Sequence, residues 1–172
     1  MLPRIVCALC FSFIATAAWG VDNALSRGVA ERAGVDPGRL IFARPVAQDA
    51  HIARLACADL ALDTLPYGAH TTGCDALWAG VPMLTCRGAT FAGRVGASLL
   101  NAAGLPELIT DSPEAYAARL LDLVSAPQRL REYGDYLNRT RGTNPLFDTA
   151  GFTRDWEALL LAIYDAAARS PG

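Results

Sequence analysis

Lysine is absent from this sequence and histidine is scarce. All 15 of its basic residues are arginine, and they stand against 17 acidic residues, so the net charge is −2. This balance does not favour a partner with a polyanionic backbone, and we expect no nucleic-acid binding. Only His51 and His70 occur, which excludes a His-rich metal site. The GxGxxG and Walker patterns are missing too, so dinucleotide and P-loop sites have little support.

The sequence also lacks the cysteine pattern of a disulfide framework. There are five cysteines, Cys7, Cys10, Cys57, Cys74 and Cys86, and an odd count does not favour paired bridges. Cys7 and Cys10 have redox or metal spacing, but without a second pair or a nearby His they are better interpreted as small buried residues. Cys74 lies at a predicted helix start, which favours a thiolate, so it is a minor candidate nucleophile. No Ser-His-Asp or Cys-His arrangement has a nucleophile-elbow context.

What is present is a chain of 172 residues with 52% hydrophobic content, enough for one domain with a substantial core. Short apolar segments alternate with helical patterns of about 8 to 14 residues, which predicts an α/β fold with a parallel sheet covered on both faces. The predicted strands are Leu40–Ala43, Leu60–Asp63, Val81–Thr85 and Leu108–Thr110. The predicted helices are Asn23–Gly34, 49–58 with Asp49 as N-cap, Gly73–Ala79, Thr90–Ala103, Pro113–Ser125, Pro127–Arg139 and Phe152–Ala168, with Gly80 and Gly104 ending two of them.

The first 20 residues allow two interpretations. Arg4 and an apolar run from Ile5 to Ala18 are typical of a secretory signal peptide, and the run is short for a membrane span. The rival interpretation is a core strand at the start of a truncated α/β domain. We therefore divide the chain into a strand or signal-like segment (1–22), a Rossmann-like lobe (23–140), and a loop with a C-terminal helix (141–172).

The most informative stretch runs from Asp63 to Pro82. A buried strand leads into a turn rich in Pro and Gly, and a helix follows, with Ala76, Leu77 and Trp78 predicted in the core. Such an arrangement suits an anion, because the first N–H groups of a helix lack intrahelical partners and the helix dipole is positive there. Thr71 or Thr72 is the predicted N-cap, and Asp75 is placed in the first turn. An ordinary capped helix after a strand explains the same local pattern.

Side chains from two units are predicted to meet beyond the carboxyl ends of the strands, where parallel sheets bind ligands. His51 and Arg54 share one helix face, and they face the same rim as the loop that precedes His70. The group as a whole suits a nucleoside diphosphate. Thr71, Thr72 and His70 suit the phosphates, Asp75 the ribose diol, His51 and Arg54 the base, and the backbone of Ala47 the edge of the base.

The residues that carry this pattern resemble the UDP-binding signature of protein O-linked N-acetylglucosamine (O-GlcNAc) transferases. The run from Leu62 to Pro82 resembles the signature most, and Phe91–Leu100 and Gly104–Ile109 also match. The spacing from Ala47 through His51 to His70 fits as well. The resemblance covers Val35 to Tyr164.

The resemblance implies a GT-B glycosyltransferase, in which two Rossmann-like lobes face a cleft. It implies transfer of N-acetylglucosamine from UDP-GlcNAc to protein Ser or Thr, with inversion and without a metal or other cofactor. By resemblance, Ala47 and Gln48 would contact uracil, and His51 and Arg54 would pack at the nucleotide. The diphosphate would be held by His70, Thr71 and Thr72, and the ribose by Asp75. Neutralising that leaving group lowers the barrier to transfer.

The sequence departs from the family in several ways. The tetratricopeptide repeats, the N-terminal lobe and the Lys-bearing segment that supports the pyrophosphate are missing, and Gln48 lies near a position that is often Lys. The resemblance places residues 1–20 at an internal strand, so we expect a cytoplasmic protein, with secretion from the signal-like residues 1–18 as the alternative. We expect a donor-binding lobe, C-terminal in the GT-B enzyme, that has lost its acceptor side. Alternatives are a non-catalytic UDP-sugar-binding remnant and an exported small helical protein. Phe152–Ala168 would expose an apolar face, which predicts a missing lobe or self-association as partner.

Overall fold

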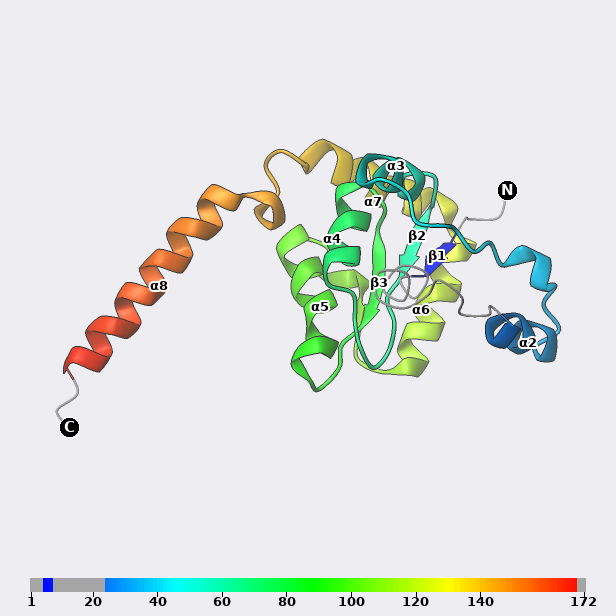
Figure 1. Ribbon diagram of the computed structural model, residues 1–172, viewed down its shortest axis with the longest axis horizontal. Coiled ribbons are helices and arrows are strands. Elements are labelled where there is room, and N and C mark those ends of the chain that lie inside the picture. Colours follow the sequence, from blue (N-terminus) through cyan, green and yellow to red (C-terminus); the bar gives the residue numbers. More distant parts are fainter. Residues whose placement is uncertain (1–4, 8–23, 170–172) are drawn as a thin grey trace.

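The computed structural model describes residues 5–7 and 24–169, and these form a parallel sheet covered by helices (Figure 1). The strands are β1 (Ile5–Cys7), β2 (Leu60–Leu62), β3 (Met83–Cys86) and β4 (Ile109–Thr110), adjacent in that order and parallel throughout. The helices are α2 (Ala24–Arg32), α3 (Gln48–Leu55), α4 (Thr71–Trp78), α5 (Phe91–Ala103), α6 (Pro113–Ser125), α7 (Pro127–Thr140) and α8 (Thr149–Arg169). Three short 3-10 helices lie at Pro37–Arg39, Pro106–Leu108 and Pro145–Phe147. The predicted α/β class is confirmed.

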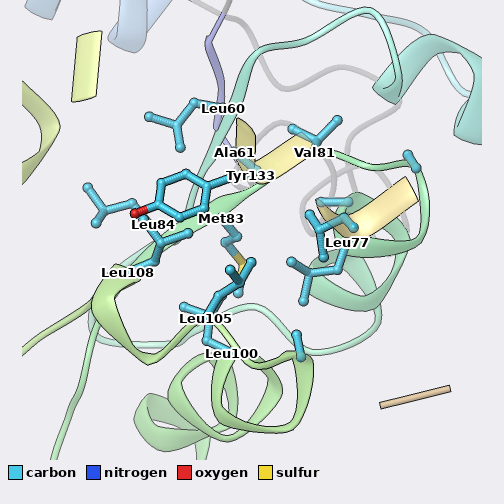
Figure 2. Close-up of a cluster of buried hydrophobic side chains, with 14 of the residues drawn as sticks. Leu60, Ala61, Leu77, Val81, Met83, Leu84, Leu100, Leu105, Leu108 and Tyr133 are labelled. Atoms are coloured by element: carbon cyan, nitrogen blue, oxygen red, sulfur yellow. The ribbon is translucent and has the colours of Figure 1, made fainter. Parts of the chain in front are cut away.

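The core forms where the helices cover both faces of the sheet. Figure 1 shows α4 and α5 on one side of β3 and α6 on the other. The strand residues Leu60, Met83 and Leu84 are fully buried between these layers, together with Leu77 of α4 and Leu100 of α5 (Figure 2). Each large apolar side chain buried in this way contributes roughly 1.5–3 kcal/mol. Burial on both faces explains why the strands appear in the sequence as unbroken apolar runs.

Helices α5 and α6 begin and end close to the predicted residues, because caps in the local sequence fix three of their ends. The Thr90 hydroxyl accepts a hydrogen bond from the Gly93 N–H (3.1 Å) and starts α5, which ends at Gly104 in the left-handed conformation, with φ of 78°. The Ser112 hydroxyl accepts from the Ala115 N–H (3.1 Å) and begins α6 with a proline in its first turn, as predicted.

The predicted strand at Leu40–Ala43 is wrong. The segment pairs with no strand in the described part of the chain, and Ile41 is 85% exposed. The edge of β2 that faces away from β3 pairs with β1 instead, in register Ile5 with Leu60. A short apolar run becomes a strand only if it finds an edge to pair with, and here the segment runs along the outside. The Arg27 guanidinium lies over the Phe42 ring, with the guanidinium carbon 5.1 Å from the ring centroid.

Two predicted details near the helix starts also need correction. Helix α3 begins at Gln48 with Ala47 as its N-cap, so Asp49 lies inside the first turn rather than capping it. Trp78, predicted in the core, is 43% exposed at the end of α4. It packs edge-on against Phe147, with ring centroids 5.0 Å apart, and under the Arg141 guanidinium. The indole ring therefore lies at the surface of the domain and not in its core.

Helix α8 is the outlier of the fold. Figure 1 shows it extending away from the sheet and the other helices, and none of its 21 residues is buried. Within residues 5–7 and 24–169 no helix is both long and apolar enough to span a bilayer. The division at residues 22 and 140 stays a prediction, and most of residues 1–22 lies outside the described part.

Candidate nucleotide-sugar site

The loop that leaves β2 is held by one buried carboxylate, Asp63, which is 6% exposed. Its Oδ1 accepts hydrogen bonds from the Thr64 N–H (2.7 Å) and the Ala69 N–H (2.6 Å). Its Oδ2 accepts from the Thr85 hydroxyl of β3 (2.6 Å). Both ends of the loop are thereby tied to one side chain. The sequence pattern places Asp63 only at the end of a strand and gives no sign of this role.

The space around this carboxylate depends on a glycine of α5. A Cβ at Gly96 would collide with Asp63 Oδ2 and would lie 2.8 Å from Thr85 Oγ1. The close packing lets α5 sit directly against the loop, where the Gly68 N–H donates to the Ala92 carbonyl (3.2 Å). The loop is therefore fixed from two sides before it reaches helix α4.

His70 is the N-cap of α4, without a side-chain capping bond. Its Nδ1 lies 2.9 Å from the Gly68 carbonyl oxygen, which can only accept, so Nδ1 carries the proton. Nε2 is then an acceptor in the neutral ring and a donor only in the imidazolium. The ring stacks on Tyr67 (5.0 Å between centroids), and Phe91 lies 6.2 Å from it on the other helix.

Thr71 and Thr72 are the first two residues of α4, so the prediction that one of them is the N-cap is wrong. The helix starts two residues earlier than predicted, and Asp75 therefore lies in its second turn. The Thr71 side chain is exposed. The Thr72 hydroxyl oxygen is buried and has no hydrogen-bond partner among the described residues. A buried hydroxyl without a partner at a helix start is an unusual cost, which a bound oxygen ligand would relieve.

Helix α3 brings a second set of side chains against α4. Asp75 Oδ2 lies 3.7 Å from His51 Nε2, and Gln48 Nε2 donates to Asp75 Oδ1 (3.3 Å). One terminal nitrogen of Arg54 donates a hydrogen bond to His51 Nδ1 (3.2 Å), and the other donates to the Arg44 carbonyl (2.8 Å). The predicted meeting of His51, Arg54 and Asp75 is therefore present in the structure, with Gln48 added to it.

The charge state of His51 follows from these contacts. Because a guanidinium nitrogen only donates, Nδ1 of His51 is the acceptor and Nε2–H points to Asp75. Burial lowers the pKa of His51 below its ordinary value, and the Arg54 charge lowers it further, while Asp75 opposes the shift. His51 is thus a neutral ring at pH 7, a suitable flat partner for a base.

Two further predicted positions have plain structural outcomes. Ala47 is exposed at the start of α3, where its carbonyl accepts the His51 N–H (2.9 Å). Burial raises the pKa of the Cys74 thiol, and the adjacent Asp75 raises it further, against a smaller opposing effect of its backbone hydrogen bond. The expectation that the helix start favours a thiolate there is wrong. In residues 5–7 and 24–169, no three His, Cys, Asp or Glu side chains gather as a metal-binding group.

Comparison with known proteins identifies the family. The model of glycosyl transferase family 41 matches residues 13–156. The chain belongs to glycosyl transferase family 41. The resemblance to O-GlcNAc transferases and the assignment to a GT-B type lobe are thereby confirmed, since curated relatives and a solved structure agree with the family match.

The family 41 relatives are much longer than this chain. It is 35% identical over 127 residues to UDP-N-acetylglucosamine–peptide N-acetylglucosaminyltransferase of Caenorhabditis elegans, covering 74% of this chain and 11% of that protein. It is 39% identical over 132 residues to the probable enzyme SEC of the same description from Arabidopsis thaliana, covering 76% and 14%. A solved mutant O-GlcNAc transferase of Thermobaculum terrenum matches with a TM-score of 0.70 and 28% identity, covering 90% of this chain and 35% of that one. The chain thus spans only a small part of its curated relatives.

Proposed function

We propose that this chain is the donor-binding lobe of a glycosyltransferase that moves N-acetylglucosamine from UDP-GlcNAc to Ser or Thr of a protein acceptor. Family membership and the activity for which the relatives are named support the reaction class. The observation that carries the donor site is the buried Thr72 hydroxyl at the start of α4, which has no hydrogen-bond partner within residues 5–7 and 24–169.

The diphosphate would lie at the N-terminus of α4. The backbone N–H groups of Thr71 and Thr72 have no carbonyl one turn earlier in the helix, and the helix dipole adds positive character. The Thr72 hydroxyl can donate to a phosphate oxygen. His70, the N-cap of the helix, lies beside these groups, with its Nδ1 donating to the Gly68 carbonyl.

The nucleoside would lie between α3 and α4. Asp75 suits the ribose diol, and the neutral ring of His51 suits the face of uracil. Ala47 and Gln48, at the start of α3, are the candidates for the edge of the base, while Arg54 holds His51 in place through its Nδ1. Gln48 currently donates to Asp75, so a ribose hydroxyl would compete for the same carboxylate.

The chemistry required of this lobe is stabilisation of the leaving group. As the glycosidic bond breaks, negative charge grows on the UDP oxygens, and fixed donors aimed at that charge lower the barrier. The first N–H groups of α4 and the Thr72 hydroxyl supply these donors, and His70 lies next to them at the N-cap. We propose that transfer needs no metal ion and that a second lobe completes the cleft for catalysis.

Titration with UDP tests the donor site. We expect wild-type binding to weaken about 10- to 100-fold in Thr72→Val, the loss of one hydrogen bond to a charged group, and also in His70→Ala. The exposed Thr143, whose hydroxyl donates to the Thr140 carbonyl, supplies the control Thr143→Val. Absence of UDP binding by the wild-type chain would refute the donor site.

Assays of GlcNAc transfer to a peptide test whether catalysis needs a second lobe. We expect the chain to bind UDP without transferring GlcNAc on its own, and any transfer that a complementing lobe restores to persist in EDTA. Transfer by the isolated chain would overturn the proposal that catalysis needs a second lobe. Loss of transfer in EDTA would overturn the proposal that the reaction needs no metal ion. Binding without restored transfer would leave a nucleotide-sugar-binding module as the function.

We also propose a cytoplasmic location. The described cysteines Cys57, Cys74 and Cys86 are free thiols, which suits a reducing compartment. Sequencing the N-terminus of the natural protein tests this, because a start near Ala18 would show export instead.

A further inference from the structure

An aromatic cluster lies beside the start of α4, next to the first turn of α5. The His70 ring stacks on the Tyr67 ring, with centroids 5.0 Å apart and planes inclined by 25°. The Phe91 ring, at the first position of α5, has its centroid 6.2 Å from that of His70. Tyr67 is 62% exposed and Phe91 is 83% exposed. Two large rings thus face solvent next to a polar helix start, where they contribute little to the core.

Close backbone packing fixes the base of this cluster. The Gly68 N–H donates to the Ala92 carbonyl (3.2 Å), which ties the loop that carries Tyr67 to the first turn of α5. A Cβ at Gly68 would lie 3.0 Å from the Ala92 carbonyl oxygen, and a Cβ at Gly93 would lie 3.3 Å from the Pro66 carbonyl oxygen. The loop and the helix start therefore form one unit, and groups held in this way bind a ligand at a lower cost in conformational entropy.

The place of the cluster follows the order of groups along a nucleotide sugar. Helix α4 lies between α3 and α5 and packs on both (Figure 1). In the donor site described above, the nucleoside lies between α3 and α4, and the diphosphate lies at the N-terminus of α4. The sugar is attached to the phosphate that is farther from the nucleoside, so it extends past the helix start, away from α3. Tyr67, His70 and Phe91 lie on that side.

We propose that Tyr67, His70 and Phe91 form the subsite for the hexose of the donor, an inference that rests on the proposed function. A pyranose ring has a face that carries mainly C–H groups, and such a face packs well on an aromatic ring. Nε2 of the neutral His70 ring is an acceptor, because Nδ1 donates to the Gly68 carbonyl, so it can receive a hydrogen bond from a sugar hydroxyl. Aromatic walls with a few polar atoms are the usual lining of a small-molecule site.

Paired titrations with UDP and UDP-GlcNAc test the subsite, because only UDP-GlcNAc carries the hexose. Phe91→Ala and Tyr67→Leu should each weaken binding of UDP-GlcNAc about three- to tenfold and change binding of UDP less than about twofold. Phe91→Tyr keeps an aromatic ring and should keep the wild-type ratio of the two affinities. Phe152→Ala is the matched control, since this ring is 66% exposed on α8, and both affinities should stay unchanged. Circular dichroism should show that each variant keeps its helices.

Saturation-transfer difference NMR measures the contact directly. Hexose protons of UDP-GlcNAc should receive saturation from the wild-type protein and clearly less from Phe91→Ala, while the uridine signals persist. If the wild type does not bind UDP at all, the donor site itself is refuted. If UDP binds but the Phe91 and Tyr67 variants weaken both ligands equally, or neither, the hexose subsite alone is overturned, and the two rings then belong to a surface that the second lobe covers.

Discussion

Replacing Asp63 by Asn should loosen the loop that presents His70. The carboxylate accepts three hydrogen bonds, two from backbone N–H groups through Oδ1 and one from the Thr85 hydroxyl through Oδ2. In the variant, the amide oxygen of Asn must accept from the N–H groups of Thr64 and Ala69, so its NH₂ group faces Thr85. The Thr85 hydroxyl must then accept a hydrogen bond from this NH₂ group instead of donating one.

The magnitude follows from the change of a charged acceptor to a neutral one. Hydrogen bonds to charged groups contribute about 1.5–3 kcal/mol each and neutral ones about 0.5–1.5, so three bonds together lose about 3 kcal/mol. That is a large fraction of the roughly 5–15 kcal/mol that separates the folded and unfolded states of a protein. Because Ala69 precedes His70 directly, the same change should also weaken UDP binding.

Urea denaturation followed by circular dichroism measures the free energy of unfolding, and titration with UDP measures binding. Asp122→Asn provides a matched control, since Asp122 is exposed on α6 and its change should stay within about 0.5 kcal/mol. If Asp63→Asn lowers the free energy of unfolding by less than about 1 kcal/mol and leaves UDP binding unchanged, the carboxylate does not hold the loop as inferred.

Three further outcomes follow from the same contacts. Gly96→Ala should cost about 2 kcal/mol in urea denaturation, through overpacking, while Gly142→Ala, with nothing within 4 Å of its added Cβ, should be nearly neutral. Because the folded pKa of His51 is lowered, the unfolded chain binds the proton first; stability should therefore fall as pH drops through about 6.5, and less so in His51→Gln. The thiol of Cys74, with its raised pKa, should be alkylated more slowly at pH 8 than the exposed Cys57, measured by peptide mass spectrometry; equal rates would contradict its burial.

Much of the helical part of the fold is determined locally. The sequence Ser112-Pro113 predicts the start of α6 at the observed residue, since a hydroxyl cap and a proline in the first turn act within one helical turn. Gly104 predicts the end of α5, because few other residues adopt its φ of 78°. Such short-range rules need no knowledge of the rest of the molecule.

The candidate site is predictable only in part. Residues of one helix, from His70 to Asp75, are placed together by their spacing. The predicted meeting with His51 depends on two segments that each follow a strand of a parallel sheet, yet the structure has no strand at Leu40–Ala43. The helices still come together, because α3 and α4 pack directly on each other.

Tertiary structure alone decided which apolar run became a strand, because a strand needs an edge to pair with and β1 takes the one beside β2. It also decided the protonation of Cys74, since burial and a neighbouring carboxylate outweigh the helix start. Asp63 shows the difference most clearly. Its position after a strand is visible in the sequence, but its three donors come from Thr64, Ala69 and Thr85, and only folding brings them to one carboxylate.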